Sequence, residues 1–309
     1  MIFIKERADV KKSLVKNIPI LSQCTEVVEV KKGFSTDKKF LVKMPDRSTF
    51  LLRLFHMDEV AHKRSEFLIL EKMNALSIRC TRPISIGEIE NQGYMVTSYL
   101  EGEDAEEKIL TCTEQEQFDI GFEAGKELKK MHQVSAPASI APWSLRKLEK
   151  HNKYIDAYAA CGIKIKNDLK IINFINENIH LMQERPNLFQ HDDYHLGNII
   201  LRNKEFAGVI DFNRYDWGDP YHEFIKIGIF SRQLSIPFSK GQIQGYFAGG
   251  EPDESFWRLY SLYLAMCVFS TVVWTLKFTP NNMEEMLNKV YTYLDDHDYF
   301  DRCRPTWYE

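Results

Sequence analysis

The first hundred residues alternate between short apolar, β-branched runs and turn-forming residues. The run at 25–30 has the period-two alternation of a half-buried strand, and residues 33–37 then interrupt it. Similar runs follow, and apolar residues recur at helical spacing after the third of them. We therefore expect a five-stranded antiparallel sheet with one main helix, with strands at 25–30, 40–44, 49–55, 84–88 and 94–100 and the helix at 59–76.

The pattern changes at the acidic segment 101–104. Beyond it, apolar residues recur mostly at helical spacing, while two short apolar runs at 198–201 and 208–211 have the length of strands. The predicted helices cover 114–132, 146–158, 169–185 and most of the chain from Tyr221 onward. The sequence thus predicts a bilobal α+β fold, with a small sheet lobe at 1–100 and a larger, mostly helical lobe at 101–309.

One uncharged stretch, residues 259–276, is long enough to be compared with a membrane span. Serine, threonine and aromatic residues dilute its apolar character, and the chain has no second stretch of this kind. A helix that is apolar on all sides is also what the core of a large helical lobe requires. We interpret the stretch as a buried core helix and expect no contact with a membrane.

Composition and charge narrow the functional classes. Of the 309 residues, 44% are hydrophobic and 13% aromatic, which is too much buriable surface for a disordered chain. The net charge of −4 argues against nonspecific nucleic-acid binding, which needs a dense positive field. The six cysteines are scattered without a C-x-x-C pair, and charged residues interrupt the N-terminal segment, unlike a signal peptide. We expect reduced thiols and a cytoplasmic protein without a nucleic-acid partner.

The most informative polar pattern is His-Asp-Asp-Tyr-His-Leu-Gly-Asn at 191–198, followed by Ile-Asp-Phe at 210–212. Asp193 and Asn198 lie on a loop that enters a strand, and Asp211 ends the next strand, so a hairpin is expected to bring them to one edge. Carboxylate and amide oxygens suit Mg²⁺, which also binds substrate phosphates. A further carboxylate can accept the proton of an attacking hydroxyl. These are the parts that phosphoryl transfer requires.

The pattern H-x-D-x-H-x-x-N, then I-D-F and Trp-Gly-Asp-Pro at 217–220, resembles the aminoglycoside phosphotransferase and choline-kinase-like family. These small-molecule kinases share the protein-kinase fold. The resemblance is strong over 184–226 and collinear over the rest, and it implies that ATP or GTP binds in the cleft between the lobes. Carried over, Asp193 is the catalytic base, and Asn198 and Asp211 are the Mg²⁺ ligands.

Two alternatives stay open for the same residues. A zinc cluster of His191, Asp193 and His195 uses ligand types that zinc accepts, but it leaves Asn198 and Asp211 unexplained. The second alternative is a module similar to a pseudokinase, which binds a nucleotide or a partner without transferring a phosphoryl group. In the phosphotransferase interpretation, His191 is structural.

The small lobe supplies the residues expected to bind the phosphate donor. Gly33 and Ser35 lie in a loop that could cover phosphates with backbone N–H groups, although it lacks G-x-G-x-x-G. Arg53 stands where kinases place a strand lysine, and a glutamate of the following helix, Glu66 or else Glu71, is its expected partner. There is no G-x-x-x-x-G-K-[ST] motif, which argues against a P-loop enzyme. The hinge residues expected to bind the base through backbone groups are Ser98 and Leu100.

The acceptor is expected to be a small cationic molecule. Aminoglycosides are polycations, so their kinases line the acceptor cleft with carboxylates. The acidic residues that follow Asp211 are Asp216, Asp219 and Glu223, and we expect these to contact the acceptor. An aminoglycoside is favoured, while choline, macrolides, homoserine and other metabolites stay open; a choline-type site would need an aromatic cage.

Overall fold

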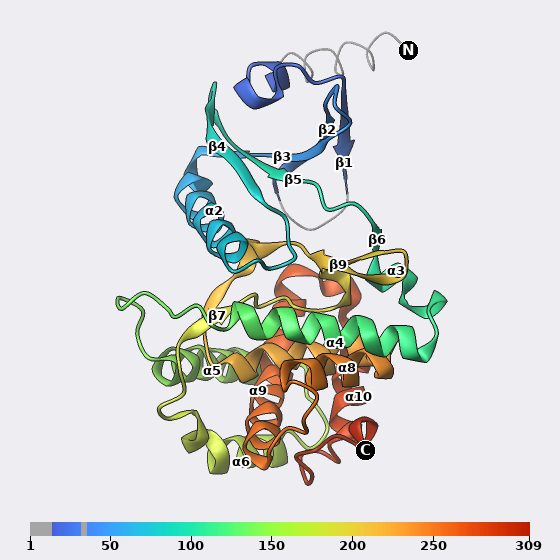
Figure 1. Ribbon diagram of the computed structural model, residues 1–309. Helices are drawn as coiled ribbons and strands as arrows, with labels where there is room; N and C mark the ends of the chain where they lie inside the picture. Colours follow the sequence, from blue (N-terminus) through green and yellow to red (C-terminus); the bar gives the residue numbers. More distant parts are fainter. Residues whose placement is uncertain (1–13, 32–35) are drawn as a thin grey trace. The chain divides into compact units, whose positions relative to one another are not determined.

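A computed structural model describes residues 14–31 and 36–309 and contains two compact units (Figure 1). The first unit consists of the described residues up to Glu101 together with Gly208–Asn213. The second consists of Gly102–Ala207 and Arg214–Glu309. The segment 208–213 thus belongs to the first unit, whereas a single boundary near residue 100 would assign it to the second.

The first unit is built on an antiparallel sheet with the strand order β1–β2–β3–β5–β4. Helix α2 follows β3, as the sequence pattern predicts, and the α+β class is confirmed. The elements are β1 (Glu26–Val30), β2 (Lys38–Lys43), β3 (Thr49–His56), α2 (Val60–Ala75), β4 (Pro83–Ile89) and β5 (Gln92–Ser98).

Strand β3 is buried on both faces over its second half. Because side chains alternate along a strand, Leu52 and Leu54 share one face, where both belong to the hydrophobic core of the unit. Arg53 therefore points to the opposite face, where Glu66 of α2 contacts it. This alternation places a guanidinium group in the interior of the unit instead of in solvent.

The segment Gly208–Asn213 joins the first unit beside the loop that precedes β4. The backbone N–H of Val209 donates to the carbonyl of Arg79 at 2.9 Å, and Val209 forms a parallel bridge with Cys80. A Cβ atom at Gly208 would lie 2.5 Å from the Arg79 carbonyl oxygen, so the close approach requires glycine. The chain thereby carries Asp211 into the first unit.

The remaining strands form two small sheets and belong to the second unit, except for the last two residues of β9. One has the order β6–β8–β9, and β9 ends two residues before Asp211 instead of at Asp211 itself. The other is an antiparallel pair of β7 and β10, which the sequence pattern does not indicate. The strands are β6 (Glu103–Asp104), β7 (Leu188–Gln190), β8 (Ile199–Arg202), β9 (Glu205–Val209) and β10 (Asp216–Gly218).

Most of the second unit is helical. Helix α6 ends at Asn178, and a 3₁₀ turn at Ile179–Met182 continues part of the helix expected at 169–185. Helix α9 is the one helix in the described part of the chain that is long and apolar enough to cross a membrane, and 72% of its most apolar window is buried. The helices are α3 (Ala105–Lys108), α4 (Glu114–Met131), α5 (Trp143–Ala160), α6 (Asp168–Asn178), α7 (Arg232–Leu234), α8 (Ile236–Tyr246), α9 (Glu254–Phe278) and α10 (Met283–Asp296).

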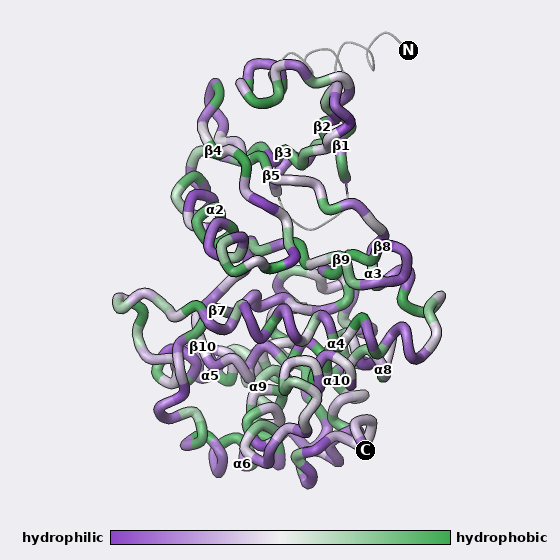
Figure 2. The backbone as a smooth tube through the Cα atoms, in the orientation of Figure 1, coloured by the Kyte–Doolittle hydropathy of each residue, from purple (hydrophilic) through white to green (hydrophobic). Residues whose placement is uncertain are grey.

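Helices α4 and α8 pack with their backbones in close contact. A Cβ atom at Gly121 or Gly125 of α4 would lie 2.1 Å from a carbonyl oxygen of α8. A Cβ atom at Gly241 or Gly245 of α8 would lie equally close, within 2.1 Å, to a carbonyl oxygen of α4. The hydropathy along α4 alternates between purple and green (Figure 2), as expected for a helix with one buried face. Small residues on both helices therefore set their separation.

Candidate functional site

The loop 191–198 connects β7 to β8 in the second unit, and three different elements hold it in place. The Tyr194 hydroxyl donates to the carbonyl of Ala124 in α4 at 2.8 Å. The backbone N–H of Asp192 donates to the Glu223 carboxylate at 3.2 Å, and that of Leu196 donates to the Ser231 hydroxyl at 3.4 Å. The loop conformation is therefore fixed by tertiary contacts before any ligand binds.

Asp193 lies between two donors. Lys226 Nζ donates to Asp193 Oδ1 at 3.0 Å, and His195 Nε2 lies 3.4 Å from the same oxygen. The backbone N–H of Gly197 donates to His195 Nδ1, so the ring proton lies on Nε2. Burial alone would raise the pKa of Asp193, but the His195 hydrogen bond and the Lys226 charge outweigh it and lower the pKa. Asp193 is therefore ionised at neutral pH.

Asn198 is fixed by the same loop. Its Nδ2 donates to the backbone carbonyl of Asp193 at 2.8 Å, so Oδ1 is the side-chain atom left to bind a cation. An amide oxygen suits a hard cation such as Mg²⁺. The structure thus brings together Asp193 and Asn198.

Asp211 lies in the first unit, in the segment after β9. Its side chain is exposed, and its backbone is in the left-handed region with φ of 66°, which is uncommon for a residue with a side chain. An exposed carboxylate on a constrained turn is a suitable oxygen ligand for Mg²⁺. Two residues later, the Asn213 side chain contacts Lys63 at 2.8 Å.

The zinc alternative finds no support in the geometry. Among the residues that the structure describes, no group of three or more His, Cys, Asp or Glu side chains is arranged to hold a metal ion. His191 is fully buried and packs edge-on against Tyr194, as expected for a structural histidine. All six cysteines are free thiols.

In the first unit, Arg53 forms two ion pairs in the interior. Its Nη1 contacts Glu66 Oε1 at 2.5 Å, so Glu66 and not Glu71 is its partner on α2. Its Nε and Nη2 contact Asp37 Oδ2 at 2.8 and 2.7 Å. An arginine held from two sides has a fixed orientation, which a phosphate-binding fork requires.

Lys63 is a polar residue of this cluster that the sequence analysis missed. Its Nζ donates to Asp37 Oδ2 and to Asn213 Oδ1, both at 2.8 Å, and its side chain is only 1% exposed. The available signal was its spacing: Lys63 precedes Glu66 by three residues and so lies on the same face of α2.

The structure places the other residues that are expected to bind the nucleotide as follows. Gly33 and Ser35 lie outside the described residues. The backbone N–H of Ser98 donates to the Arg82 carbonyl and its hydroxyl accepts from the Arg82 N–H, both at 2.8 Å, so that N–H group is engaged within the unit. Leu100 lies beyond the end of β5 and is half-buried.

The three carboxylates expected to contact the acceptor are all paired within the second unit. Asp216 forms an ion pair with Arg146 at 3.1 Å. Asp219 is fully buried, accepts two hydrogen bonds from Arg185 at 2.7 and 2.9 Å, and accepts a third from Tyr263 at 2.7 Å.

Glu223 is also buried, at 1% exposure, beneath the 191–198 loop. A buried carboxylate needs hydrogen-bond or ion-pair partners, and Asp219 and Glu223 both find them within the second unit. In this structure they connect parts of the second unit instead of lining a surface.

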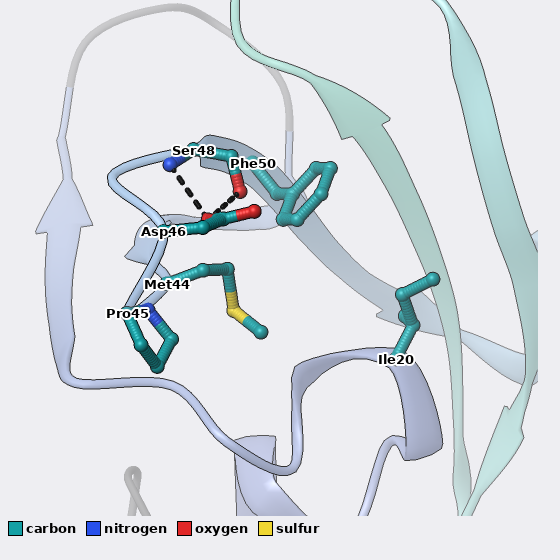
Figure 3. A pocket seen from close by; sticks show the side chains of 6 residues that line it. All are labelled: Ile20, Met44, Pro45, Asp46, Ser48 and Phe50. Atoms are coloured by element: carbon teal, nitrogen blue, oxygen red, sulfur yellow. Dashed lines mark hydrogen bonds between the residues drawn. The ribbon is translucent and has the colours of Figure 1, made fainter.

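A pocket of about 400 Å³ lies on the first unit at the turn between β2 and β3 (Figure 3). Its wall contains no residue of the expected donor site. Asp46 in this wall accepts hydrogen bonds from the backbone and hydroxyl of Ser48, so its carboxylate is used by the turn. The lining residues are Ile20, Met44, Pro45, Asp46, Ser48 and Phe50.

Comparison with known proteins agrees with the resemblance seen in the sequence. Residues 26–260 match the family model described as the phosphotransferase enzyme family (APH). No significant match was found among curated protein sequences.

Solved structures of aminoglycoside phosphotransferases share the fold. A streptomycin–ATP complex of APH(2'')-IIa is 16% identical, with 97% of this chain and 98% of that chain covered and a TM-score of 0.63. An ADP-bound APH(2'')-Ib is 16% identical over 97% and 99% of the two chains, with a TM-score of 0.62. A complex of a thermostable APH(4)-Ia mutant with AMP-PNP and hygromycin B is 14% identical over 92% and 96%, with a TM-score of 0.68. The expected kinase-like fold is thereby confirmed.

Proposed function

Because the chain belongs to the phosphotransferase enzyme family, we propose that it transfers the γ-phosphoryl group of ATP or GTP to a hydroxyl group of a small molecule. The observation that carries this proposal is the environment of Asp193. Its carboxylate is ionised, is held by Lys226 and His195 through Oδ1, and lies on a loop anchored to α4. Oδ2 is thus the oxygen that accepts a hydrogen bond from an acceptor hydroxyl.

The reaction is an in-line displacement. The acceptor oxygen forms a bond to the γ-phosphorus while the bond from that phosphorus to the β–γ bridging oxygen breaks, and Asp193 takes the hydroxyl proton. A carboxylate with a lowered pKa is a weak base, so its main contribution is to orient the hydroxyl until the proton becomes acidic late in the transfer. Lys226 and His195 keep the carboxylate oriented.

The metal and nucleotide roles follow from the chemistry of the donor atoms. The amide oxygen of Asn198 and the carboxylate of Asp211 are the groups that would hold Mg²⁺, which when bound offsets negative charge on the β- and γ-phosphates. Arg53, oriented by Glu66, binds phosphate oxygens of the nucleotide.

An aminoglycoside is one candidate acceptor. The support comes from solved structures of the same fold, which are complexes of aminoglycoside phosphotransferases with streptomycin and with hygromycin B. It is weakened by the burial and internal pairing of Asp219 and Glu223, since these two carboxylates are then not free to bind ammonium groups. Asp216 is partly exposed and is paired with Arg146.

A second candidate acceptor, one that carries a carboxylate or another anionic group, is favoured by the charges near the 191–198 loop. Lys147 Nζ contacts His222 Nε2 at 2.8 Å, and no carboxylate of the described residues forms an ion pair with it. Burial first, and then the charges of Lys147, Lys150 and Lys226, lower the pKa of His222, so this histidine is neutral. Burial lowers the pKa of Lys147, while the charges of Asp192 and Asp216 oppose that shift. In its protonated form Lys147 attracts an anionic acceptor and repels a polycation.

The test of the proposed function is donor consumption by the purified protein with Mg²⁺. ATP and GTP are offered separately against aminoglycosides, macrolides, choline, homoserine and hydroxy acids. We expect acceptor-dependent turnover that Asp193→Asn reduces by at least about a thousandfold, while nucleotide affinity and thermal stability show that the variant is folded. Asp156→Asn, at an exposed position of α5, is the matched control.

The results of this experiment distinguish the two candidate acceptors. If the protein phosphorylates aminoglycosides and Lys147→Met does not change this turnover, the acceptor is a polycation. If the protein phosphorylates a hydroxy acid and Lys147→Met raises the KM for it, the acceptor is an anion. Lys153→Met, on the same helix and exposed, is the control for lysine removal. Nucleotide binding without turnover across the panel, or unchanged turnover in Asp193→Asn, contradicts the proposed function.

A further inference from the structure

A buried cluster of charged side chains lies in the first unit between helix α2 and the beginning of strand β2. A single carboxylate oxygen, Oδ2 of Asp37, is at its centre. This oxygen accepts from Arg53 Nε at 2.8 Å, Arg53 Nη2 at 2.7 Å and Lys63 Nζ at 2.8 Å. The side chains of Asp37 and Lys63 are each 1% exposed.

The cluster carries no excess positive charge. Arg53 and Lys63 are balanced by Asp37 and Glu66, Asn213 is neutral, and the partly exposed Glu59 carboxylate lies 3.7 Å from Lys63 Nζ. Burial would raise the pKa of Asp37, but the charges and hydrogen bonds of Arg53 and Lys63 lower it, so this carboxylate is anionic. A neutral cluster gives no net attraction to a polyphosphate, although both of its cations are of the types that bind phosphate.

Asp37 occupies the position in which a phosphate oxygen would satisfy the same donors. A guanidinium fork and an ammonium group converge on one anionic oxygen, which is the arrangement that both cations adopt with phosphate as well as with carboxylate. Asp37 also directly precedes β2, at the end of the loop that the sequence predicts to cover phosphates.

We propose that Lys63 is a second phosphate-binding cation of the nucleotide site, and that the Asp37 carboxylate holds the place of a phosphate until a nucleotide displaces it. The proposal rests on the proposed function, because it concerns the donor site of that reaction. When Asp37 moves away, the N–H groups of Arg53 and Lys63 that it had accepted from are left for phosphate oxygens.

Replacement of Asp37 by a phosphate matters more for Lys63 than for Arg53, because Lys63 has fewer close anionic partners. Arg53 keeps Glu66 at 2.5 Å when Asp37 leaves. Lys63 keeps only the neutral amide of Asn213 at 2.8 Å, with Glu59 and Glu66 at 3.7 and 3.9 Å. A buried ammonium group that loses its closest anion gains most from a phosphate oxygen.

The experiment measures binding of MgADP, and separately of inorganic tripolyphosphate, by isothermal titration calorimetry. Asp37→Asn removes the competing charge and keeps the shape, so we expect its Kd for both probes to fall about tenfold, equivalent to about 1.4 kcal/mol. Lys63→Gln should raise both Kd values about tenfold, and the double variant should lose the gain of Asp37→Asn. The matched controls are Asp46→Asn and Lys43→Gln, at exposed positions around the β2–β3 turn.

A purely structural ion cluster predicts different results. Asp37→Asn would then bind both probes equally or more weakly than the unchanged protein, and either result overturns the proposal. Unchanged binding in a folded Lys63→Gln variant overturns it as well. If Asp37→Asn does not fold, Lys63→Gln compared with Lys43→Gln still decides whether Lys63 binds phosphate.

The proposed function can fail separately. Tripolyphosphate binding that strengthens in Asp37→Asn and weakens in Lys63→Gln, without any acceptor-dependent turnover, would support this proposal and contradict the phosphotransferase activity. A protein that transfers phosphoryl groups but shows no gain in Asp37→Asn would overturn this proposal and leave the proposed function standing.

Discussion

The contact between α4 and α8 predicts that Gly125→Ala destabilises the second unit, although alanine is the better helix former. A Cβ atom at this position would lie 2.1 Å from the Gln242 carbonyl oxygen and 2.6 Å from the Tyr246 backbone nitrogen. An ordinary contact between carbon and oxygen is about 3.3 Å, so the helices must separate by about 1.2 Å. Because backbone atoms block the methyl group, no change of side-chain rotamer relieves the clash.

The magnitude follows from two opposing terms. Replacing glycine by alanine in a helix stabilises by about 1 kcal/mol, and overpacking costs about 1–3 kcal/mol, or more when backbones must shift. Because backbone atoms must shift here, the cost lies in the upper part of that range, and we expect a net loss of about 1–2 kcal/mol. The double variant with Gly241→Ala should lose less than the sum of the two single variants, because one separation of the helices relieves both clashes.

Urea unfolding followed by tryptophan fluorescence measures this loss as a lower midpoint with an unchanged slope. Gly250→Ala is the control, since its Cβ would meet no atom closer than 3.3 Å. Turnover should also fall by about 10–100-fold, because the Ala124 carbonyl beside Gly125 holds the Tyr194 hydroxyl and with it the Asp193 loop. A Gly125→Ala protein as stable as the unchanged protein would refute the close backbone contact.

Three further predictions concern charged groups of the second unit. Asp219→Asn should lower the free energy of unfolding by about 3–5 kcal/mol by leaving Arg185 without its anion, and a selective rise in acceptor KM at unchanged stability would contradict this structural role. Burial raises the pKa of Asp192 from 3.8 to about 6, so ionisation of this carboxyl lowers the stability of the folded protein as pH rises from 4 to 6. Asp192→Asn should therefore raise the free energy of unfolding by about 1–2 kcal/mol at pH 7.5 and by almost nothing at pH 4. Urea titrations at both pH values measure this difference. Lys226→Met removes a cause of the lowered pKa of Asp193, so the acidic limb of the kcat–pH profile should move to higher pH, and an unmoved limb in the pH titration of turnover would exclude this role.

Local sequence patterns were sufficient for the elements of the first unit. The run around Arg53 has strand periodicity, and that periodicity alone determines that Arg53 and its neighbours point to opposite faces. Periodicity also predicted Glu66 as the partner of Arg53, because the helical period of α2 determines which glutamate faces the sheet. These predictions needed only one strand, one helix and their connection.

Local patterns could not predict that the segment Gly208–Asn213 belongs to the first unit. Its place in the first unit depends on a bridge between Val209 and Cys80, which are far apart in the sequence. Lys63 was missed for a related reason: a lysine on an amphipathic helix is usually in solvent, and here Asp37 and Asn213 come from two distant segments to surround it. Burial of a charge is a tertiary property, since it depends on the partners that the fold supplies.

The carboxylates after Asp211 show why counting acidic residues does not identify an acceptor. Asp219 and Glu223 follow the expected metal ligand in the same stretch of sequence, yet each is buried and each fixes another part of the second unit. What an acceptor meets is the charge left after such internal pairing, not the formal charge of the segment. Lys147, which contacts His222, forms no ion pair with a described carboxylate, and its protonated form favours an anion. The ratio of turnover with a hydroxy acid to turnover with an aminoglycoside, measured before and after Lys147→Met, therefore tests the charge of the acceptor directly: the ratio should fall if Lys147 binds an anionic group, and a constant ratio would remove the argument for one.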